Sequence, residues 1–147
     1  MKMVLKRILA GVTAAVMIMT FAVTAFAVKY SDTKTKATSE FGTLTGVQKF
    51  DLGNGYGRKL FRHKTSISKL SSTNITTTLY TQVDILDYKT GKLVGSDQLG
   101  GVKNQLSVES VWVDRNDVGR NNLISGFGAH EARRSGSAVV YTQLIGF

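Results

Sequence analysis

The stretch Asn74-Ile-Thr-Thr-Thr-Leu-Tyr-Thr-Gln-Val-Asp-Ile-Leu86 decides the fold class of this chain. Every second residue in it is apolar or a threonine, and this set comprises Ile75, Thr77, Leu79, Thr81, Val83 and Ile85. A repeat of two residues is the pattern of a β-strand, whose side chains point alternately to its two faces. Four threonines between residues 73 and 78 add to this, because side chains branched at Cβ suit a pleated sheet better than a helix.

The residues that follow predict a hairpin. Asp87-Tyr-Lys-Thr-Gly91 is a turn sequence, with Gly91 at the position where the backbone enters the left-handed region. Lys92-Leu-Val-Gly95 is the expected returning strand, and residues 95–104, which contain three glycines, are expected to form a loop.

The same alternation recurs on both sides of this hairpin. It is found in residues 40–48, 58–68 and 105–114, and a last hairpin is predicted from residues 128–133 and 137–145 around Arg134-Ser135-Gly136. The glycine-rich segment 51–57 and the polar segment 115–126 separate these strands as a turn and a loop. About seven strands, with no amphipathic helix after residue 27, predict an all-β fold, either a small antiparallel β-sandwich or a barrel.

The N-terminus has the three parts of a secretory signal peptide. Lys2, Lys6 and Arg7 supply positive charge, residues 8–21 are almost wholly apolar, and Ala25-Phe26-Ala27 ends in the small-x-small pattern that signal peptidase cleaves. We therefore expect residues 1–27 to be removed after Ala27 and the product to be secreted, either extracellular or associated with the cell surface.

An uncleaved membrane anchor is the alternative for this segment. Residues 8–28 would just span a hydrocarbon core of about 30 Å as a helix that rises about 1.5 Å per residue. A secreted product that still begins at Met1 would contradict the cleavage.

The chain contains no cysteine, which narrows its class. A bacterial lipoprotein needs a cysteine after its signal sequence, and a small secreted eukaryotic domain usually depends on disulfides. The sequence therefore favours a bacterial exported protein held together by its core alone. We expect residues 28–39 to be a flexible leader and residues 40–147 to form a single β domain.

The mature chain is basic. Three of the 19 lysines and arginines lie in the predicted signal peptide, and none of the 10 acidic residues does, so the formal charge falls from +9 to +6. A positive exported protein is attracted to anionic wall polymers, acidic glycans and anionic membrane surfaces, although ordinary solubilising charge is the alternative.

No motif in the chain identifies a catalytic chemistry. There is no cysteine and no Gly-x-Ser-x-Gly elbow, and Ser66-Ile-Ser-Lys69 matches Ser-x-x-Lys at a strand end, whereas the working motif begins a helix. The glycines of residues 51–57 lack the Lys-Ser/Thr and the helix of a phosphate-binding loop. We therefore expect no enzyme activity and no cofactor.

Metal binding is not expected either. His63 and His130 stand in no ligand spacing, so a shared site would require the fold to bring them together with a carboxylate. Asp114-Arg-Asn-Asp117 resembles a calcium loop only loosely, because it lacks the repeated aspartates and the closing glutamate.

One segment is unusually basic. Six basic or histidine residues lie between positions 58 and 69 without an acid, and Arg62 and Lys64 fall on one face of a strand, about 6.5 Å apart. The candidate anion-binding patch consists of Arg58, Lys59, Arg62 and Lys64, joined by Arg133 and Arg134 if the fold brings them close. The alternatives are a solvated sheet face, or an edge strand made basic to block aggregation.

These residues favour a binding module over an enzyme. The expected ligand is an anionic cell-surface polymer, a glycan or a membrane surface. Specific nucleic-acid binding is not expected, because Tyr56, Phe61 and Tyr80 are the only aromatic rings near the basic segment. The alternative function is a bacteriocin-like or membrane-active effector, which the threonine-rich residues 73–81 and the positive charge would also suit.

Overall fold

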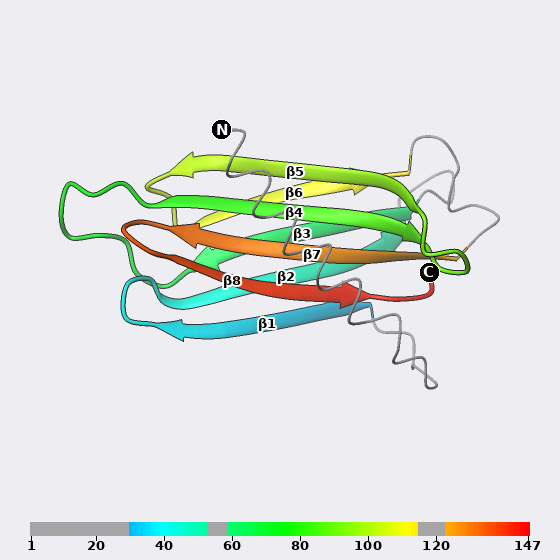
Figure 1. Cartoon of the computed structure of the whole chain (residues 1–147), viewed down its shortest axis with the longest axis horizontal. Coiled ribbons are helices and arrows are strands. Elements are labelled where there is room, and N and C mark those ends of the chain that lie inside the picture. The colour runs from blue at the N-terminus through cyan, green and yellow to red at the C-terminus, as the bar shows by residue number, and fades with distance from the viewer. Residues whose placement is uncertain (1–29, 53–58, 115–122) are drawn as a thin grey trace.

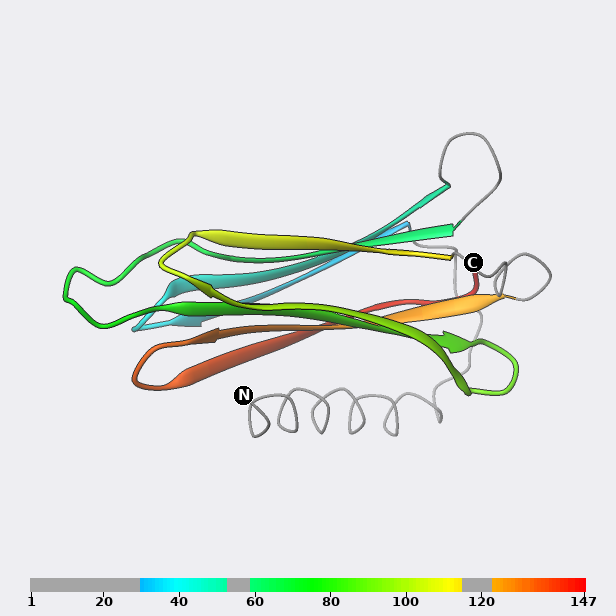
Figure 2. The same ribbon diagram turned by 90° about the horizontal axis from the view of Figure 1, so that it is seen from above.

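The chain folds as a β-sandwich, as predicted. The computed structural model describes residues 30–52, 59–114 and 123–147, and these form eight antiparallel strands in two four-stranded sheets (Figures 1 and 2). In chain order the strands are β1 (Ser31–Thr38), β2 (Gly42–Leu52), β3 (Lys59–Ile67), β4 (Thr78–Asp87), β5 (Leu93–Lys103), β6 (Ser107–Val113), β7 (Ile124–Arg133) and β8 (Ser137–Leu144).

The two sheets lie face to face, as the edge-on view in Figure 2 shows. Sheet A has the strand order β1-β2-β3-β6 and sheet B the order β5-β4-β7-β8. At one side of the sandwich β1 lies against β8, where the backbone N–H of Gln143 donates to Asp32 Oδ2 at 3.0 Å. At the other side β5 lies against β6, where Ser110 Oγ donates to Asp97 Oδ2 at 2.5 Å. We call these two lines of contact the β1–β8 seam and the β5–β6 seam.

The hairpin predicted from residues 74–95 is the β4–β5 unit. The backbone N–H of Gly91 donates to the carbonyl of Asp87 at 2.8 Å, and Asp87 Oδ1 accepts from the N–H of Thr90 at 2.7 Å. Gly91 has a φ of 69°, the left-handed conformation that the sequence predicted. The last predicted hairpin is likewise confirmed as β7 and β8.

The flexible leader predicted for residues 28–39 is wrong for most of its length. Ser31–Thr38 is strand β1, which pairs antiparallel with β2 from Ser31 opposite Lys49 to Thr38 opposite Gly42. It is an edge strand, and seven of its eight residues are not buried, so no apolar repeat marks it in the sequence. Its pairing shows that the β domain begins before residue 40.

The loop predicted for residues 95–104 is also wrong, since β5 runs through to Lys103. Two glycines of this strand make room for aromatic side chains and do not form a turn. A Cβ on Gly95 would meet the indole of Trp112 at 2.6 Å, and Gly100 lies as closely against the ring of Tyr80. The described residues form eight strands where about seven were predicted, and the additional strand is β1.

The interior of the sandwich is divided into three zones along the strands. One end holds an apolar cluster that includes Phe41, Leu44, Ile67 and Leu79, and the other end holds Phe50, Phe61, Val83, Ile85, Ile124, Leu144 and Phe147. Between them lies a band of inward polar side chains, which we call the polar layer: Gln48, His63, Thr65, Thr81, His130 and Thr142. Each inner strand thus passes from one apolar cluster through the polar layer to the other.

The β4–β5 turn makes a test of backbone conformation alone, because a Cβ on Gly91 would meet nothing within 4 Å. We expect Gly91→Ala to lower the free energy of unfolding by about 1 kcal/mol, since alanine is strained at positive φ. Gly91→Asn should cost less, because asparagine tolerates this region better. Urea unfolding of both variants measures this, and equal losses for alanine and asparagine would contradict the assignment.

Candidate functional site

The polar layer is the most unusual feature of the interior. Its six side chains come from β2, β3, β4, β7 and β8, and none of them exposes more than 1% of its surface. Burying polar groups costs free energy unless they are hydrogen-bonded, and this cost is large for two imidazoles. We therefore expect these side chains to be hydrogen-bonded to one another.

Glycines make the room that this network needs. A Cβ on Gly46 would lie 2.5 Å from Cγ of His130, and a Cβ on Gly128 would lie 2.8 Å from Nε2 of the same ring. A Cβ on Gly126 would lie 2.6 Å from Cδ1 of Phe61 and would also collide with the amide of Gln48. These strand glycines let the two sheets approach around the polar side chains.

His63 connects the layer to the β5–β6 seam. Its Nε2 lies 2.9 Å from Asp97 Oδ2, and its Nδ1 lies 3.0 Å from Thr81 Oγ1. The carboxylate of Asp97, whose side chain is 29% exposed, is the end of the network nearest to solvent. The same carboxylate oxygen accepts the hydroxyl of Ser110.

His130 extends the network to the other side of the sandwich. Its Nδ1 lies 3.0 Å from Thr65 Oγ1 and 3.4 Å from Thr81 Oγ1, so Thr81 stands between the two imidazoles. Its Nε2 lies 2.8 Å from Thr142 Oγ1, which in turn lies 3.3 Å from Gln48 Oε1. The chain of contacts thus runs from Asp97 on β5 to Gln48 on β2.

Burial keeps both imidazoles neutral. Loss of solvation, together with the charge of the neighbouring His63, lowers the pKa of His130 to about 3. Loss of solvation also lowers the pKa of His63, although the hydrogen bond and the negative charge of Asp97 act in the opposite direction.

The contacts of the two imidazoles bear on catalysis and metal binding. Both ring nitrogens of each histidine are already engaged, and Ser110 bonds to Asp97 rather than to an imidazole. Among the residues that the structure describes, no three histidines or carboxylates are grouped as metal ligands would be. The fold does bring His63 and His130 into one layer, but with Thr81 between them.

The predicted anion-binding residues fall in separate places. Arg62 and Lys64 point outward from β3 on the exposed side of sheet A, as the strand alternation predicted. Arg62 forms an ion pair with Asp51 at 2.8 Å, and Lys64 stands opposite Glu109 on β6. β3 is an inner strand of its sheet, so a basic edge strand is not the explanation for this segment. Arg58 lies outside the described residues.

The remaining cations do not join Arg62 and Lys64. Lys59 is partly buried at the start of β3, where burial lowers its pKa and the charge of Asp114 raises it. Arg133 lies on the outward side of sheet B, bonded to Glu131 at 2.5 Å and stacked on the ring of Tyr80.

Arg134 has a structural role at the end of the sandwich. Its guanidinium donates to Thr77 Oγ1 at 2.9 Å and to the carbonyls of Glu40 and Lys69, and it lies over the ring of Phe41. It ties the β7–β8 turn to the segments that follow β1 and β3, and it is not a free surface charge.

Sequence reasoning missed one cation that belongs with Arg62 and Lys64. Lys49 on β2 is the direct cross-strand partner of Arg62 and is exposed on the same side of sheet A. We call Lys49, Arg62 and Lys64 the cationic face. Only the register between β2 and β3 reveals this neighbour, because the number of residues between the two strands does not fix their pairing.

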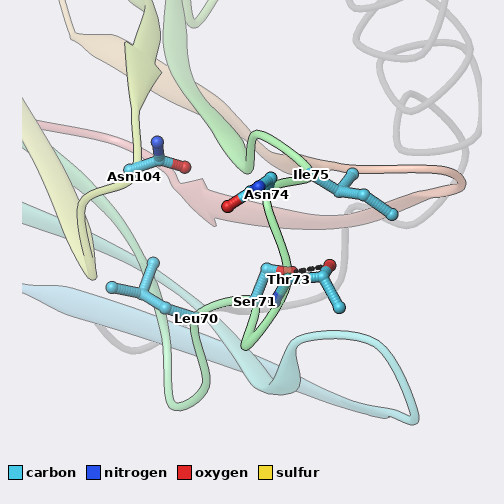
Figure 3. A pocket seen from close by; sticks show the side chains of 6 residues that line it. All are labelled: Leu70, Ser71, Thr73, Asn74, Ile75 and Asn104. Carbon is cyan, nitrogen blue, oxygen red and sulfur yellow. Dashed lines mark hydrogen bonds between the residues drawn. The ribbon is translucent and has the colours of Figure 1, made fainter.

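A hollow of about 270 Å³ lies at the end of the sandwich, between the β3–β4 segment and the β5–β6 turn (Figure 3). Its lining is Leu70, Ser71, Thr73, Asn74, Ile75 and Asn104. Ser71 and Thr73 bond to each other at 2.8 Å, and Asn104 Oδ1 accepts the backbone N–H of Thr77. No titratable side chain is among these six residues, so the hollow offers no acid or base for catalysis.

The polar layer predicts acid sensitivity. Because the folded pKa of His130 lies below the 6.5 of an unperturbed histidine, the unfolded chain binds the proton first. The stabilisation from His130 is complete above about pH 6.5 and is lost as the pH falls toward 3, at about 1.4 kcal/mol per pH unit. At pH 5 the loss from His130 alone should be about 2 kcal/mol.

The measurement is the slope of the unfolding free energy between about pH 6.5 and 5, a range above the titration of most carboxylates. His130→Gln should reduce this slope by about one proton, whatever it does to the absolute stability. An unchanged slope would show that His130 does not stay neutral in the fold.

The glycine cradle makes a second prediction. We expect Gly126→Ala to lower the free energy of unfolding by about 1–3 kcal/mol, because the new Cβ would press on Phe61 and Gln48. Ser125→Ala is the matched control on the same strand, since its hydroxyl has no hydrogen-bond partner among the described residues. Thermal unfolding should show little change for Ser125→Ala; similar losses for both variants would argue against the cradle.

Comparison with known proteins does not place the chain in a family. No protein-family model matches the sequence, and no curated protein matches it closely enough to count as a relative.

Proposed function

We propose that this protein is an exported, non-enzymatic β-sandwich that binds an anionic polymer of a cell surface through the cationic face. The observation that carries the proposal is the register of β2 and β3, which sets Lys49 directly opposite Arg62. Lys64 lies two residues further along β3 on the same side of the sheet.

Two cations facing each other across a strand pair repel, and this pairing costs stability. Asp51 relieves only part of the repulsion, through its ion pair with Arg62. An anionic group placed over Lys49 and Arg62 would remove the rest, and a second group of the same polymer would reach Lys64, about 6.5 Å along the strand. A repeating polyanion therefore suits this surface better than a single anion.

The side chains around these cations are mostly short. The outward neighbours on β2 and β3 include Thr45, Val47 and Ser66, whose side chains are short. Two acids also lie beside the cations, Asp51 at Arg62 and Glu109 opposite Lys64. A linear polymer could lie across the strands without a preformed pocket.

Export is supported by the sequence of residues 1–27, which lie outside the described residues. Within the described part of the chain we find no helix with the length and apolar character needed to cross a bilayer. The bacterial origin rests on the absence of cysteine from an exported chain of this size.

The test is binding of the mature chain to immobilised heparin, a stand-in for an anionic surface polymer, as salt is increased. We expect Lys49→Gln, Arg62→Gln and Lys64→Gln together to weaken binding about 10- to 100-fold at low salt. The slope of log affinity against log salt should fall by about 2–3, because three charge contacts are lost. Folding of the variant is checked by circular dichroism.

The matched control changes the net charge equally at other exposed sites, with Lys89→Gln, Lys92→Gln and Lys103→Gln in the β4–β5 hairpin. Equal weakening by both triple variants would mean that net charge alone governs binding and would refute the cationic face. Leakage of dye from anionic vesicles by the mature chain would favour the membrane-active effector instead.

A further inference from the structure

The hydrogen bonds of the polar layer have a direction that can be derived from Asp97. Its carboxylate only accepts, so Nε2 of His63, 2.9 Å away, must carry a hydrogen. In a neutral imidazole the other nitrogen is then bare, and Nδ1 of His63 must accept the hydroxyl hydrogen of Thr81.

The direction continues through His130. Thr65 donates its hydroxyl hydrogen to the carbonyl of Tyr80 at 2.8 Å, and Thr81 donates its own to His63, so both oxygens can only accept from His130 Nδ1. His130 therefore carries its hydrogen on Nδ1, and its bare Nε2 accepts from Thr142 at 2.8 Å.

Gln48 ends the chain. Thr142 has one hydrogen, which is used on His130, so the Gln48 amide must present its nitrogen to Thr142 for the contact of 3.3 Å to be a hydrogen bond. With the carbonyl turned toward Thr142 instead, Thr142 would have to donate to Gln48, and Nε2 of Gln48 has no partner among the described residues. The two amide orientations occupy the same space and belong to opposite directions of the chain.

We propose that the Gln48–Thr142–His130–Thr81–His63–Asp97 chain is a two-state proton sensor, in which protonation of His63 reverses every hydrogen bond as far as Gln48. In the neutral state all donors point toward Asp97. In the protonated state His63 donates from both nitrogens, so Thr81 must accept from His63 and turn its hydroxyl toward His130 Nδ1, 3.4 Å away.

The reversal then continues from His130 to Gln48, because each group that now accepts a hydrogen must donate on its other side. With its Nδ1 accepting, His130 carries its single hydrogen on Nε2 and donates to Thr142, which turns its hydroxyl toward Gln48 Oε1. The reversed chain holds one proton more than the neutral chain, taken from solvent. The hydroxyls of Thr81 and Thr142 rotate, His130 exchanges its hydrogen from Nδ1 to Nε2, and the Gln48 amide turns over so that Oε1 replaces its nitrogen beside Thr142.

The charged groups around the two histidines favour protonation of His63 before His130. His63 faces Asp97 from β5, and Glu109 of β6 adds negative charge nearby, whereas His130 sits deeper and is opposed by His63 itself. Two groups favour protonation of His130: the backbone of Lys64 on β3, through a hydrogen bond, and the negative charge of Asp32 on β1, from the opposite side of the sandwich. The chain therefore links the β5–β6 seam, where Asp97 is partly exposed, to the inner side of β2 and β8 beside the β1–β8 seam.

The direction is tested first at neutral pH, by long-range proton–nitrogen NMR correlations of the two histidine rings in the mature chain. We expect His63 to carry its hydrogen on Nε2 and His130 on Nδ1. Any other pair of tautomers would overturn the proposal, because only this pair lets both neutral rings bond along the whole chain.

The coupling is tested by lowering the pH. As His63 takes up its proton, Nδ1 of His130 should change from the protonated to the unprotonated resonance position, at the same pH midpoint. Thr81→Val removes the link between the rings, so His130 should keep its Nδ1 hydrogen while His63 titrates. Thr65→Val is the matched control, since Thr65 lies beside this path and not on it.

Three results would refute the sensor. They are a His130 tautomer that stays constant in the wild-type chain, coupling that survives Thr81→Val, and global unfolding before His63 is protonated. Unfolding counts against the proposal because the reversed chain must be accommodated inside the folded sandwich.

Discussion

The structure depends on the need to satisfy two imidazoles that are wholly removed from water. His63 and His130 lie in the middle of the core, where an unpaired ring nitrogen would cost more free energy than most single contacts contribute. Every strand of sheet B and three strands of sheet A supply a partner to the network or make room for it. The register of both sheets is thereby fixed, because a slip of one residue on an inner strand would replace a hydrogen-bonding group by an outward side chain.

The apolar clusters and the polar layer contribute differently to the fold. The clusters at the two ends, one around Phe41 and Leu44 and the other around Phe50, Phe61 and Phe147, contribute non-directional burial that tolerates small shifts. The polar layer contributes little net stability, since its groups were already hydrated in the unfolded chain. The polar layer instead fixes how the strands align with one another, which the two apolar clusters alone would not do.

The sequence predicted the fold class and the two hairpins, because half-buried strands such as β3, β4 and β8 carry a visible two-residue repeat. It did not predict β1 or most of β5, because an exposed edge strand has no apolar face to produce such a repeat. It also took Gly95 and Gly100 as loop residues, although they leave space for Trp112 and Tyr80, partners that only the folded sheet brings near. The polar layer was unpredictable for the same reason: Gln48, Thr81 and Thr142 look like ordinary strand residues until the register aligns them.

The basic segment of residues 58–69 shows how the pleat of a strand separates a cluster that looks continuous in the sequence. Arg62 and Lys64 point to solvent, while His63 between them points into the core and meets Asp97. β3 therefore carries two residues of the cationic face on one side and His63 of the proposed proton sensor on the other. Charges on the outer side of β3 therefore act on the imidazole on its inner side. Glu109, which stands opposite Lys64 on the outer side, raises the pKa of His63 through its negative charge. A polyanion bound over Arg62 and Lys64 would add to that negative charge and make protonation of His63 easier, so binding at the surface and the state of the core would be linked.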